Sequence, residues 1–552
     1  VQLTGVYFDK GAVLTGVVGE QLPPEWIIQY AGSVLGVIGK DKIYDIQSRY
    51  MEQHPHHIPL LFMADVIHGC RTIAPIPLGQ ACSFHPELVS EAASIAASEA
   101  SSEGLRATFS PMIDVSRDPR WGRMMESFGE DPYVNGIMGK AMVDGYQQKA
   151  DTGIAACLKH FAGYGAVNAG REYNDVEISQ RTFLEQYVKP FRMALKAKPA
   201  MVMTAFNAID RKPISGNKEL LKGLLRDKEG FEGTVISDWG SIGQLEEQGV
   251  AADMEEAAIQ ASEAGVDIDM MSPAYMLCLE KLVESGKIPE AFVDESAFRV
   301  LMMKNQLGLF ENPFAGLGKS GKLTLHNREK AYQLAGESCV LLKNENEILP
   351  FDENTVKNVA VVGPLSDVWY KDWYCGIPPY EVTVLDGIRE AFPNAKISHE
   401  TGLSEIRIRL ADQTSDKCYV GLDENTRLKL VIKEQAETFI LNDWGCGSMT
   451  LVAKSNGRFV TLEEDTDIIK ADKKEAFGWF VRELWNLKWE KSSFTLESWN
   501  KKQVIVDKDG HFSICVDNPP ARFEIEIVKD GKTAAEKTAK EADHVIAVIG
   551  CN

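Results

Sequence analysis

The sequence is poor in several features that would each define a class of protein. No apolar stretch approaches the roughly 20 residues needed to span a bilayer, so no membrane-spanning helix is predicted. The ten cysteines form no CxxC pair and no cluster with histidine, which argues against a structural zinc site and gives no sign of a disulfide framework. Basic residues are also scarce: 59 Lys and Arg stand against 80 Asp and Glu, a net charge of −21. A surface this acidic argues against nucleic acid as a ligand.

What is present is ordinary globular composition, with 44% hydrophobic and 25% charged residues over 552 residues. At roughly 150 residues per domain this length predicts three to four domains. The sequence begins at Val1 rather than Met and shows no charged-then-apolar leader, so we expect a signal peptide to be either absent or already removed. It stops at Asn552, directly after an apolar segment, 544–550, that is typical of a strand entering a turn. We therefore expect it to be a piece of a longer protein.

The first 310 or so residues alternate short apolar runs with longer amphipathic stretches, a pattern typical of βα units around a parallel sheet. The predicted helices of this region include 86–105, 131–149 and 254–264. The predicted strands are 58–65, 107–114, 153–160, 200–207, 233–238 and 265–270.

Nearly every one of these predicted strands ends in polar or titratable residues, namely Asp65, Asp114, Lys159-His160, Asn207 and Asp238. In a closed (β/α) barrel, functional side chains lie at the C-terminal strand ends around one common mouth. The alternative is that each Asp or Asn caps the following helix. Five coinciding cases favour a functional site.

A second α/β region follows. A helix over 293–309 precedes a Gly/Lys linker at 316–322, which predicts a domain boundary. Residues 328–342 predict a helix running into a strand, 358–363 a buried strand and 384–392 a helix. The pattern is then interrupted and resumes at 534–550.

The interruption is rich in short alternating strands and repeats itself. Segment 419–425 resembles 459–465 and, more weakly, 504–510, at spacings of 40 and 45 residues. A second series, Phe439, Phe480 and Phe523, keeps a similar rhythm. Three such repeats predict a three-fold all-β domain resembling a β-trefoil of the fascin type. The alternative is a β-sandwich with accidental spacing.

Three short segments carry candidate chemistry. Asp238 follows an apolar strand and is itself followed by Trp239, whose flat face suits the C–H surface of a sugar; a carboxylate beside such a wall suits glycoside cleavage. Lys159 and His160 provide two hydrogen-bond donors at another strand end. Segment 117–126 is densely charged, and its simplest interpretation is an internally paired structural loop.

Together these segments resemble the family-three glycoside hydrolases, in the β-glucosidase branch. The resemblance lies in KHFAGYG, RDPRWGRMMESFGEDP, VMTAFNAIDRKPISGN and GTVISDWGSI. It extends through nearly all of residues 1–400 and resumes near 534, and it implies a (β/α)8-type barrel followed by an α/β sandwich that carries the inserted all-β domain. The domains expected are the barrel at 1–312, a linker at 313–327, the sandwich at 328–402, the insert at 403–533 and the resumed sandwich at 534–552.

The same resemblance implies roles for individual residues. Asp238 would be the nucleophile of a retaining mechanism, forming a covalent glycosyl–enzyme intermediate. Trp239 would stack on the next sugar and Arg171 would hold the pocket loop. The pocket for the terminal sugar would be lined by Asp65, Arg123, Lys159, His160 and Met203.

Three departures from the family pattern qualify these roles. Phe206 stands where many relatives carry Tyr. Tyr164 stands where the N-acetylglucosaminidase branch carries its histidine proton donor, which argues against hexosaminidase activity. The acid/base residue of the glucosidase branch is a glutamate in a loop after the strand that 544–550 resembles, and we expect it beyond Asn552.

The function expected is an exo-acting β-glucosidase that removes terminal glucosyl residues from β-glucosides or cello-oligosaccharides. The resemblance also implies that Asp65, rather than Glu, at the pocket floor favours a sugar with a 6-hydroxymethyl group, and so glucose over xylose. A β-xylosidase, an exo-β-glucanase and a non-enzymatic carbohydrate-binding protein remain as alternatives. No metal or organic cofactor, nucleic acid or membrane is expected to take part. The insert could bind glycans, act as a spacer or form a dimer contact, and we expect a secreted or periplasmic protein.

Overall fold

The computed structural model describes residues 2–4, 7–9, 12, 31–149, 151–319, 324–411, 415–445, 447–463, 466–478, 481–515 and 519–550. The chain divides into two compact units. Unit 1 comprises Val1–Lys343 together with Lys371–Pro379, and unit 2 comprises Asn344–Tyr370 together with Tyr380–Asn552.

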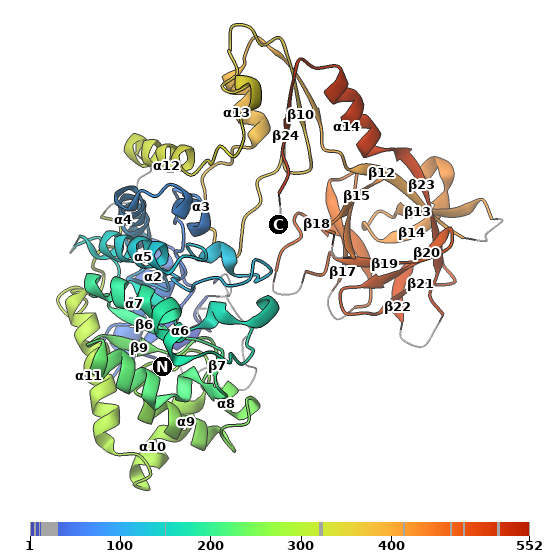
Figure 1. Ribbon diagram of the computed structural model, residues 1–552. Coiled ribbons are helices and arrows are strands. Elements are labelled where there is room, and N and C mark those ends of the chain that lie inside the picture. Colours follow the sequence, from blue (N-terminus) through green and yellow to red (C-terminus); the bar gives the residue numbers. More distant parts are fainter. Residues whose placement is uncertain are drawn as a thin grey trace. The chain divides into compact units, whose positions relative to one another are not determined.

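Parallel strands form the centre of unit 1 (Figure 1). They are β1 (Gln2–Thr4), β2 (Ser33–Leu35), β3 (Leu61–Ala64), β4 (Ala107–Thr108), β5 (Cys157–Phe161), β6 (Met201–Thr204) and β9 (Thr234–Ile236). Isolated parallel bridges join Ala107 to Ala155, Ile236 to Ile268 and Gln2 to Met270. These bridges connect the two sheets β1–β4 and β5-β6-β9 into a closed ring, whose interior is filled by apolar side chains such as Leu61, Met201 and Ile236.

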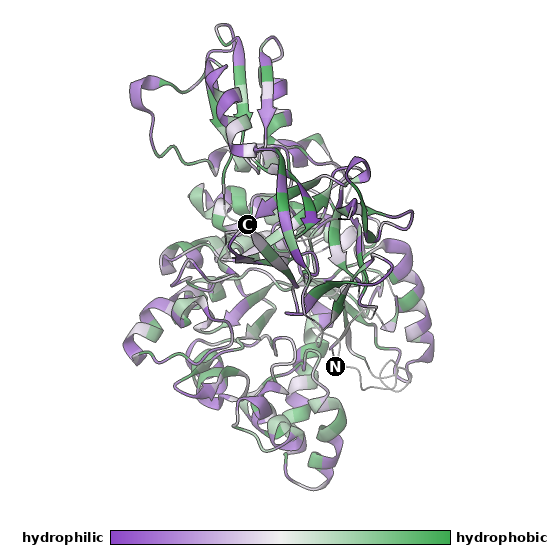
Figure 2. Cartoon of the chain, turned by 90° about the vertical axis from the view of Figure 1, so that its right-hand side faces the viewer, coloured by the Kyte–Doolittle hydropathy of each residue, from purple (hydrophilic) through white to green (hydrophobic). Residues whose placement is uncertain are grey.

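Helices lie between these strands and after the last of them, and Figure 2 shows hydrophilic and hydrophobic residues along them. Buried helix residues such as Leu88 and Val143 share one core cluster with strand residues such as Phe62. The helices include α2 (Lys40–Gln53), α3 (Pro77–Cys82), α4 (Pro86–Ser102), α5 (Pro132–Gln147), α7 (Lys189–Ala194), α9 (Met254–Ala264), α10 (Ala274–Glu284), α11 (Glu290–Gln306) and α12 (Leu325–Glu337). Local signals set their ends: Asp131 accepts hydrogen bonds from two backbone N–H groups at the start of α5, and Gly265 terminates α9 at φ 86°.

The expected strand after α12 is wrong. The helix ends at Glu337, and residues 339–343, which the structure describes, form no strand. Leu341 and Leu342 are exposed. A strand needs a neighbour to complete its hydrogen-bond ladder, and none of the described strands pairs with this segment.

Unit 2 contains a small parallel sheet with the order β11 (Lys396–Glu400), β10 (Asn358–Val362) and β24 (His544–Ala547). Helix α13 (Val384–Ala391) begins with a capping box between Thr383 and Asp386, and α14 (Gly531–Lys540) precedes β24. Apolar residues of this sheet and of α13 form one core cluster, which includes Val359, Val361 and Leu385.

Between β11 and α14 lies an all-β segment of unit 2. Its strands are β12 (Ser404–Leu410), β13 (Lys417–Leu422), β14 (Leu428–Ile432), β15 (Phe439–Asp443), β16 (Ser448–Ala453), β17 (Arg458–Leu462), β18 (Ile469–Lys473), β19 (Trp485–Glu490), β20 (Ser493–Ser498), β21 (Gln503–Val506), β22 (Phe512–Cys515) and β23 (Arg522–Lys529). Antiparallel pairing follows the order β12-β15-β16-β19-β20-β23 and returns to β12, which closes a six-stranded barrel.

The remaining six strands form three hairpins, β13-β14, β17-β18 and β21-β22. Isolated bridges, including Arg427 to Lys470 and Ile468 to Ser513, connect the hairpins to one another. The three sequence segments that resemble one another lie at the first strand of each hairpin. Of the aromatic series, Phe439 and Phe523 are buried in the core, whereas Phe480 lies outside the described residues. Trp485, Phe494 and Phe512 are further buried aromatic residues of this segment that the sequence spacing missed.

Candidate active site

A cluster of charged side chains lies at the C-terminal ends of the parallel strands of unit 1. Asp65 directly follows β3, Lys159 and His160 belong to β5, and Asp238 comes two residues after β9. Met203 lies in β6 and is buried among the apolar side chains inside the ring. The structure thus brings together Asp65, Lys159, His160 and Asp238, which are among the strand-end residues expected at one mouth.

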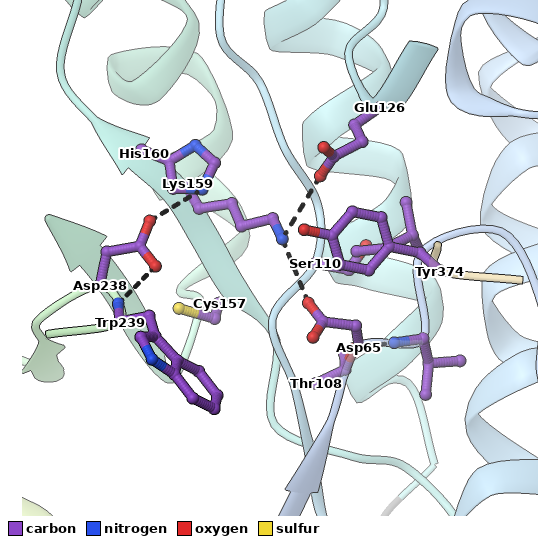
Figure 3. A network of polar contacts seen from close by, with 12 residues as sticks. Asp65, Thr108, Ser110, Glu126, Cys157, Lys159, His160, Asp238, Trp239 and Tyr374 are labelled. Carbon is purple, nitrogen blue, oxygen red and sulfur yellow. Dashed lines mark hydrogen bonds and ion pairs between the residues drawn. The ribbon is translucent and has the colours of Figure 1, made fainter. Parts of the chain in front are cut away.

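Lys159 is the centre of the cluster (Figure 3). Its Nζ lies 3.2 Å from Oδ1 of Asp65 and 3.6 Å from Oε2 of Glu126. Glu126 is also paired with Arg123, whose Nε and Nη2 donate to its two carboxylate oxygens at 2.7 and 3.0 Å. Two cations and two carboxylates therefore form one buried network that can offer several donors and acceptors to hydroxyl groups.

Asp238 has two unequal carboxylate oxygens. Oδ1 accepts a hydrogen bond from the backbone N–H of Trp239 at 2.6 Å. Oδ2 lies 3.3 Å from Nε2 of His160 but makes no hydrogen bond with the described residues. The backbone therefore fixes one oxygen while the other keeps its lone pairs available.

His160 lies between two carboxyl groups. Oδ2 of Asp114 is 2.8 Å from Nδ1 of His160 and also accepts the backbone N–H of the same residue at 2.9 Å. The ring of Tyr164 contacts the imidazole edge to face. Asp114 thus fixes the orientation of His160, whose Nε2 faces Asp238.

Burial is the main cause of the pKa shifts in this cluster. It raises the pKa of Asp238 to about 6 and that of Asp114 to about 7, although Arg123 and Lys159 oppose both shifts. Burial also lowers the pKa of His160 well below its usual range, so this imidazole is neutral at pH 7. Perturbed groups that converge at a strand-end mouth mark a functional site.

One aromatic residue adjoins the Asp238 carboxylate, and a second packs against tyrosines of the neighbouring loop. Trp239 packs, partly buried, against the apolar clusters on both sides of the ring, and in Figure 3 it lies on the same side of Lys159 as Asp238. Phe206 contacts Tyr173 and Tyr164 and is nearly buried. Trp239 therefore provides an apolar face beside Asp238.

Arg171 lies outside the cluster. It is exposed, and its Nε donates to the backbone carbonyl of Asn168 at 3.4 Å. The neighbouring Glu172 holds this loop instead, since its carboxylate accepts the Trp121 indole N–H and the Tyr164 hydroxyl. The expected role of Arg171 in holding the pocket loop stays a prediction.

Three residues of the cluster carried no expected role in the pocket. Asp114 was visible as the end of a predicted strand, and Glu126 as part of the charged loop at 117–126. Tyr374 contacts the cluster through its hydroxyl, which lies 3.4 Å from Nη2 of Arg123. No local sequence pattern indicated this contact, because the two residues are 251 positions apart. Within the described residues no group of three or more His, Cys, Asp or Glu side chains is arranged to hold a metal ion.

Two family models match the chain. The Glycosyl hydrolase family 3 N terminal domain matches residues 26–303, and the Glycosyl hydrolase family 3 C-terminal domain matches residues 339–552. The chain belongs to glycosyl hydrolase family 3. The first match covers strands β2 to β9 with Asp65, Lys159 and Asp238, and the second covers all of unit 2.

Relatives with curated names include a periplasmic beta-glucosidase from Salmonella typhimurium, which is 40% identical over 387 residues, covering 67% of this chain and 50% of its own length. A beta-xylosidase from Formosa agariphila is 34% identical, with 61% of this chain and 50% of its own length covered. This family 3 chain spans about half the length of such relatives.

Among solved structures, that of beta-glucosidase from Listeria innocua in complex with isofagomine is similar to this family 3 chain, with a TM-score of 0.68 and 41% identity. The similarity covers 73% of this chain and 57% of that one. No helix among the residues that the structure describes is long and apolar enough to cross a membrane.

Proposed function

We propose that the protein is a retaining, exo-acting β-glucosidase, with Asp238 as its nucleophile. The observation that carries the proposal is the asymmetry of the Asp238 carboxylate: one oxygen accepts a backbone hydrogen bond, and the other makes none with the residues that the structure describes. A nucleophile needs such an available oxygen, held still at the mouth of the barrel.

In the proposed reaction, Oδ2 of Asp238 attacks C1 of the terminal sugar while the bond from C1 to the glycosidic oxygen breaks. The leaving oxygen takes a proton from the acid/base glutamate, which the family resemblance assigns to a position beyond Asn552. Water then attacks C1 of the glycosyl ester, gives its proton to the same glutamate, and releases Asp238 as a carboxylate.

The other cluster residues hold the sugar. Lys159 and Arg123 donate to hydroxyl oxygens, and Asp65 and Glu126 accept from hydroxyl protons. Such contacts can strengthen as the ring flattens toward an oxocarbenium ion. Trp239 would stack on the next sugar.

We propose glucose as the preferred terminal sugar, because Asp65 leaves the pocket floor shorter than a glutamate would. A periplasmic beta-glucosidase and solved β-glucosidases among the relatives support this choice and a periplasmic or secreted location. The similarity to a beta-xylosidase supports the xyloside alternative. An exo-β-glucanase of the same family is the third alternative, which the resemblance implies. The proposal includes no cofactor.

We also propose that the ring of unit 1 is a (β/α)8-type barrel and that the all-β segment is a β-trefoil. The closed six-stranded barrel and the three interconnected hairpins support the second assignment. The proposed boundaries are the domain ranges expected from the sequence, with the insert at 403–533. A role of the insert in a homodimer contact stays a prediction.

The experiment is hydrolysis of 2,4-dinitrophenyl β-D-glucoside and β-D-xyloside, whose leaving group departs without a proton from an acid. We expect faster release of dinitrophenolate from the glucoside, and a loss of at least about a thousandfold in Asp238→Asn. Asp269→Asn is the matched control, since Asp269 is also a buried aspartate of unit 1 and accepts a hydrogen bond from Ser272 outside the cluster. A faster xyloside would overturn the choice of glucose, and an active Asp238→Asn would overturn the mechanism.

A further inference from the structure

Segment Lys371–Pro379 belongs to unit 1 although the chain on both sides of it belongs to unit 2. It contacts the loop that follows Asp65. The backbone N–H of Ile377 donates to the carbonyl of Cys70 at 2.8 Å. At Gly376 the backbone comes so near this carbonyl that an added Cβ would lie 2.1 Å from the oxygen. Only glycine fits there, so this contact is specific to the sequence.

Asp372 is the second anchor of the segment. Its Oδ2 lies 2.7 Å from Nε2 of His68, and its Oδ1 accepts the backbone N–H of Tyr374 at 2.7 Å. Nδ1 of His68 lies 2.9 Å from the carbonyl of Ala74. Both imidazole nitrogens therefore face acceptors, which is the arrangement of a protonated histidine. Burial lowers the pKa of His68, but the hydrogen bond and the charge of Asp372 outweigh it, and the net pKa is raised.

These anchors place Tyr374 in the charged cluster. Nζ of Lys159 lies 4.9 Å from the centre of its ring, a cation–π distance, and its hydroxyl lies 3.4 Å from Nη2 of Arg123. In Figure 3, Tyr374 and Asp238 lie on opposite sides of Lys159. Burial raises the pKa of the phenol well above its usual range, so the hydroxyl is neutral and can both donate and accept.

We propose that Tyr374 is a specificity-determining residue, forming the wall of the pocket at the C4–C5 end of the terminal sugar, and that Asp372 and His68 are its positioning residues. This inference rests on the proposed function. If C1 of a pyranose lies at Asp238, the opposite end of the ring points toward Lys159, Asp65 and Tyr374. Glucose and xylose differ only at that end, by the hydroxymethyl group on C5. The tyrosine ring therefore limits the space in which the two sugars differ.

The test compares two imino sugars, 1-deoxynojirimycin, which has the shape of glucose, and 1,5-dideoxy-1,5-imino-D-xylitol, which lacks the hydroxymethyl group. Calorimetry gives the ratio of their dissociation constants, and no turnover is required. Tyr374→Ala is expected to shift the ratio toward the glucose-shaped ligand by about tenfold, the usual value of one carbon group in a pocket. Tyr374→Phe keeps the ring and is expected to keep the ratio. Tyr133→Ala, at an exposed tyrosine of α5, is the matched control.

The positioning role is tested with Asp372→Ala. It is expected to shift the ratio in the same direction as Tyr374→Ala, and the double variant is expected to show no further shift, because both changes act through one ring. A merely structural role of Asp372 would weaken both ligands equally and leave their ratio unchanged. Additive shifts in the double variant would overturn the positioning role.

The two levels of the proposal fail differently. If both imino sugars bind and Tyr374→Ala leaves their ratio unchanged, the specificity role is wrong while the sugar pocket stands. If neither ligand binds the unsubstituted chain, the proposed function fails and this inference fails with it.

Discussion

The two closed barrels of this chain differ in where their charged side chains lie, buried in one and at the surface in the other. The parallel ring of unit 1 carries Lys159, Asp65 and Glu126 at its mouth, with side chains that are 3%, 8% and 3% exposed. The antiparallel barrel of unit 2 is filled by apolar residues, and its lysine–carboxylate pairs lie at the surface, as in Lys454–Glu405, where the lysine is 52% exposed.

The difference in buried charge separates a barrel that only has to be stable from one that also carries a functional site. Burying ions costs free energy that pairing only partly recovers, so a barrel that serves stability alone keeps its ion pairs at the surface. The cluster in unit 1 buries its charges despite this cost, and burial raises the pKa values of Asp65 and Asp238 as a consequence. We interpret the excess of buried charge as the mark of the functional barrel.

The largest effect is expected from breaking the buried network. Lys159→Met leaves Asp65 without its lysine partner and should destabilise unit 1 by about 3–5 kcal/mol, the usual cost of an uncompensated buried charge. Urea unfolding followed by hydrogen exchange at the β5 peptide measures it.

The matched control for that change is Lys454→Met, the same substitution at an exposed pair in unit 2. It should cost less than about 1 kcal/mol at the β16 peptide. Equal costs at the two sites would contradict the comparison between the barrels.

A somewhat smaller effect is expected from opening a cavity in the apolar barrel. Leu451 of β16 is 2% exposed, and Leu451→Ala should destabilise the all-β segment by about 3 kcal/mol. The cost should be measured by hydrogen exchange at β15 and β20, while protection of β5 and β9 stays unchanged. Loss of protection in the parallel strands would show that the two barrels do not unfold independently.

The smallest effect concerns pH. Because burial raises the pKa of Asp238 to about 6, its carboxylate is mostly protonated below that pH, and nucleophilic attack should fall about tenfold between pH 7 and pH 5. The same shift contributes stability at low pH, which is lost as pH rises through 6. Glu526 of unit 2 has the opposite sign: its hydrogen bond to Lys433 lowers its pKa, so its contribution is lost as pH falls. Initial rates with the dinitrophenyl glucoside from pH 4.5 to 8 check the predicted fall in the rate of attack by Asp238. A midpoint of that fall near pH 4 would contradict the raised pKa.

Much of the fold could be predicted because its signals are local. The helix over 254–264 agrees with α9 at both ends, since an aspartate cap and a glycine stop mark them in the sequence. Strand ends were predicted less accurately. A strand was expected at 233–238, but β9 covers only Thr234–Ile236, because the hydrogen-bond ladder stops before the polar residues that leave the sheet. The false strand after α12 shows that apolar residues alone do not make a strand without a partner.

The candidate site was predictable in part for the same reason. Asp65, Lys159, His160 and Asp238 each follow or end an apolar run, so strand-end position identified them. Glu126 could be seen as charged but not as a partner of Lys159, since that contact depends on how a loop folds back. Tyr374 reaches the cluster through a long-range contact that no local pattern records.

The central claim is that Asp238 forms the covalent bond to the sugar. The most direct measurement is to incubate the folded protein with 2-deoxy-2-fluoro-β-D-glucosyl fluoride, whose intermediate turns over slowly, and to map the labelled peptide by mass spectrometry. We predict one fluoroglucosyl adduct, located on Asp238 and absent from Asp238→Asn. An adduct on another residue, or no adduct on a folded sample, would contradict the claim.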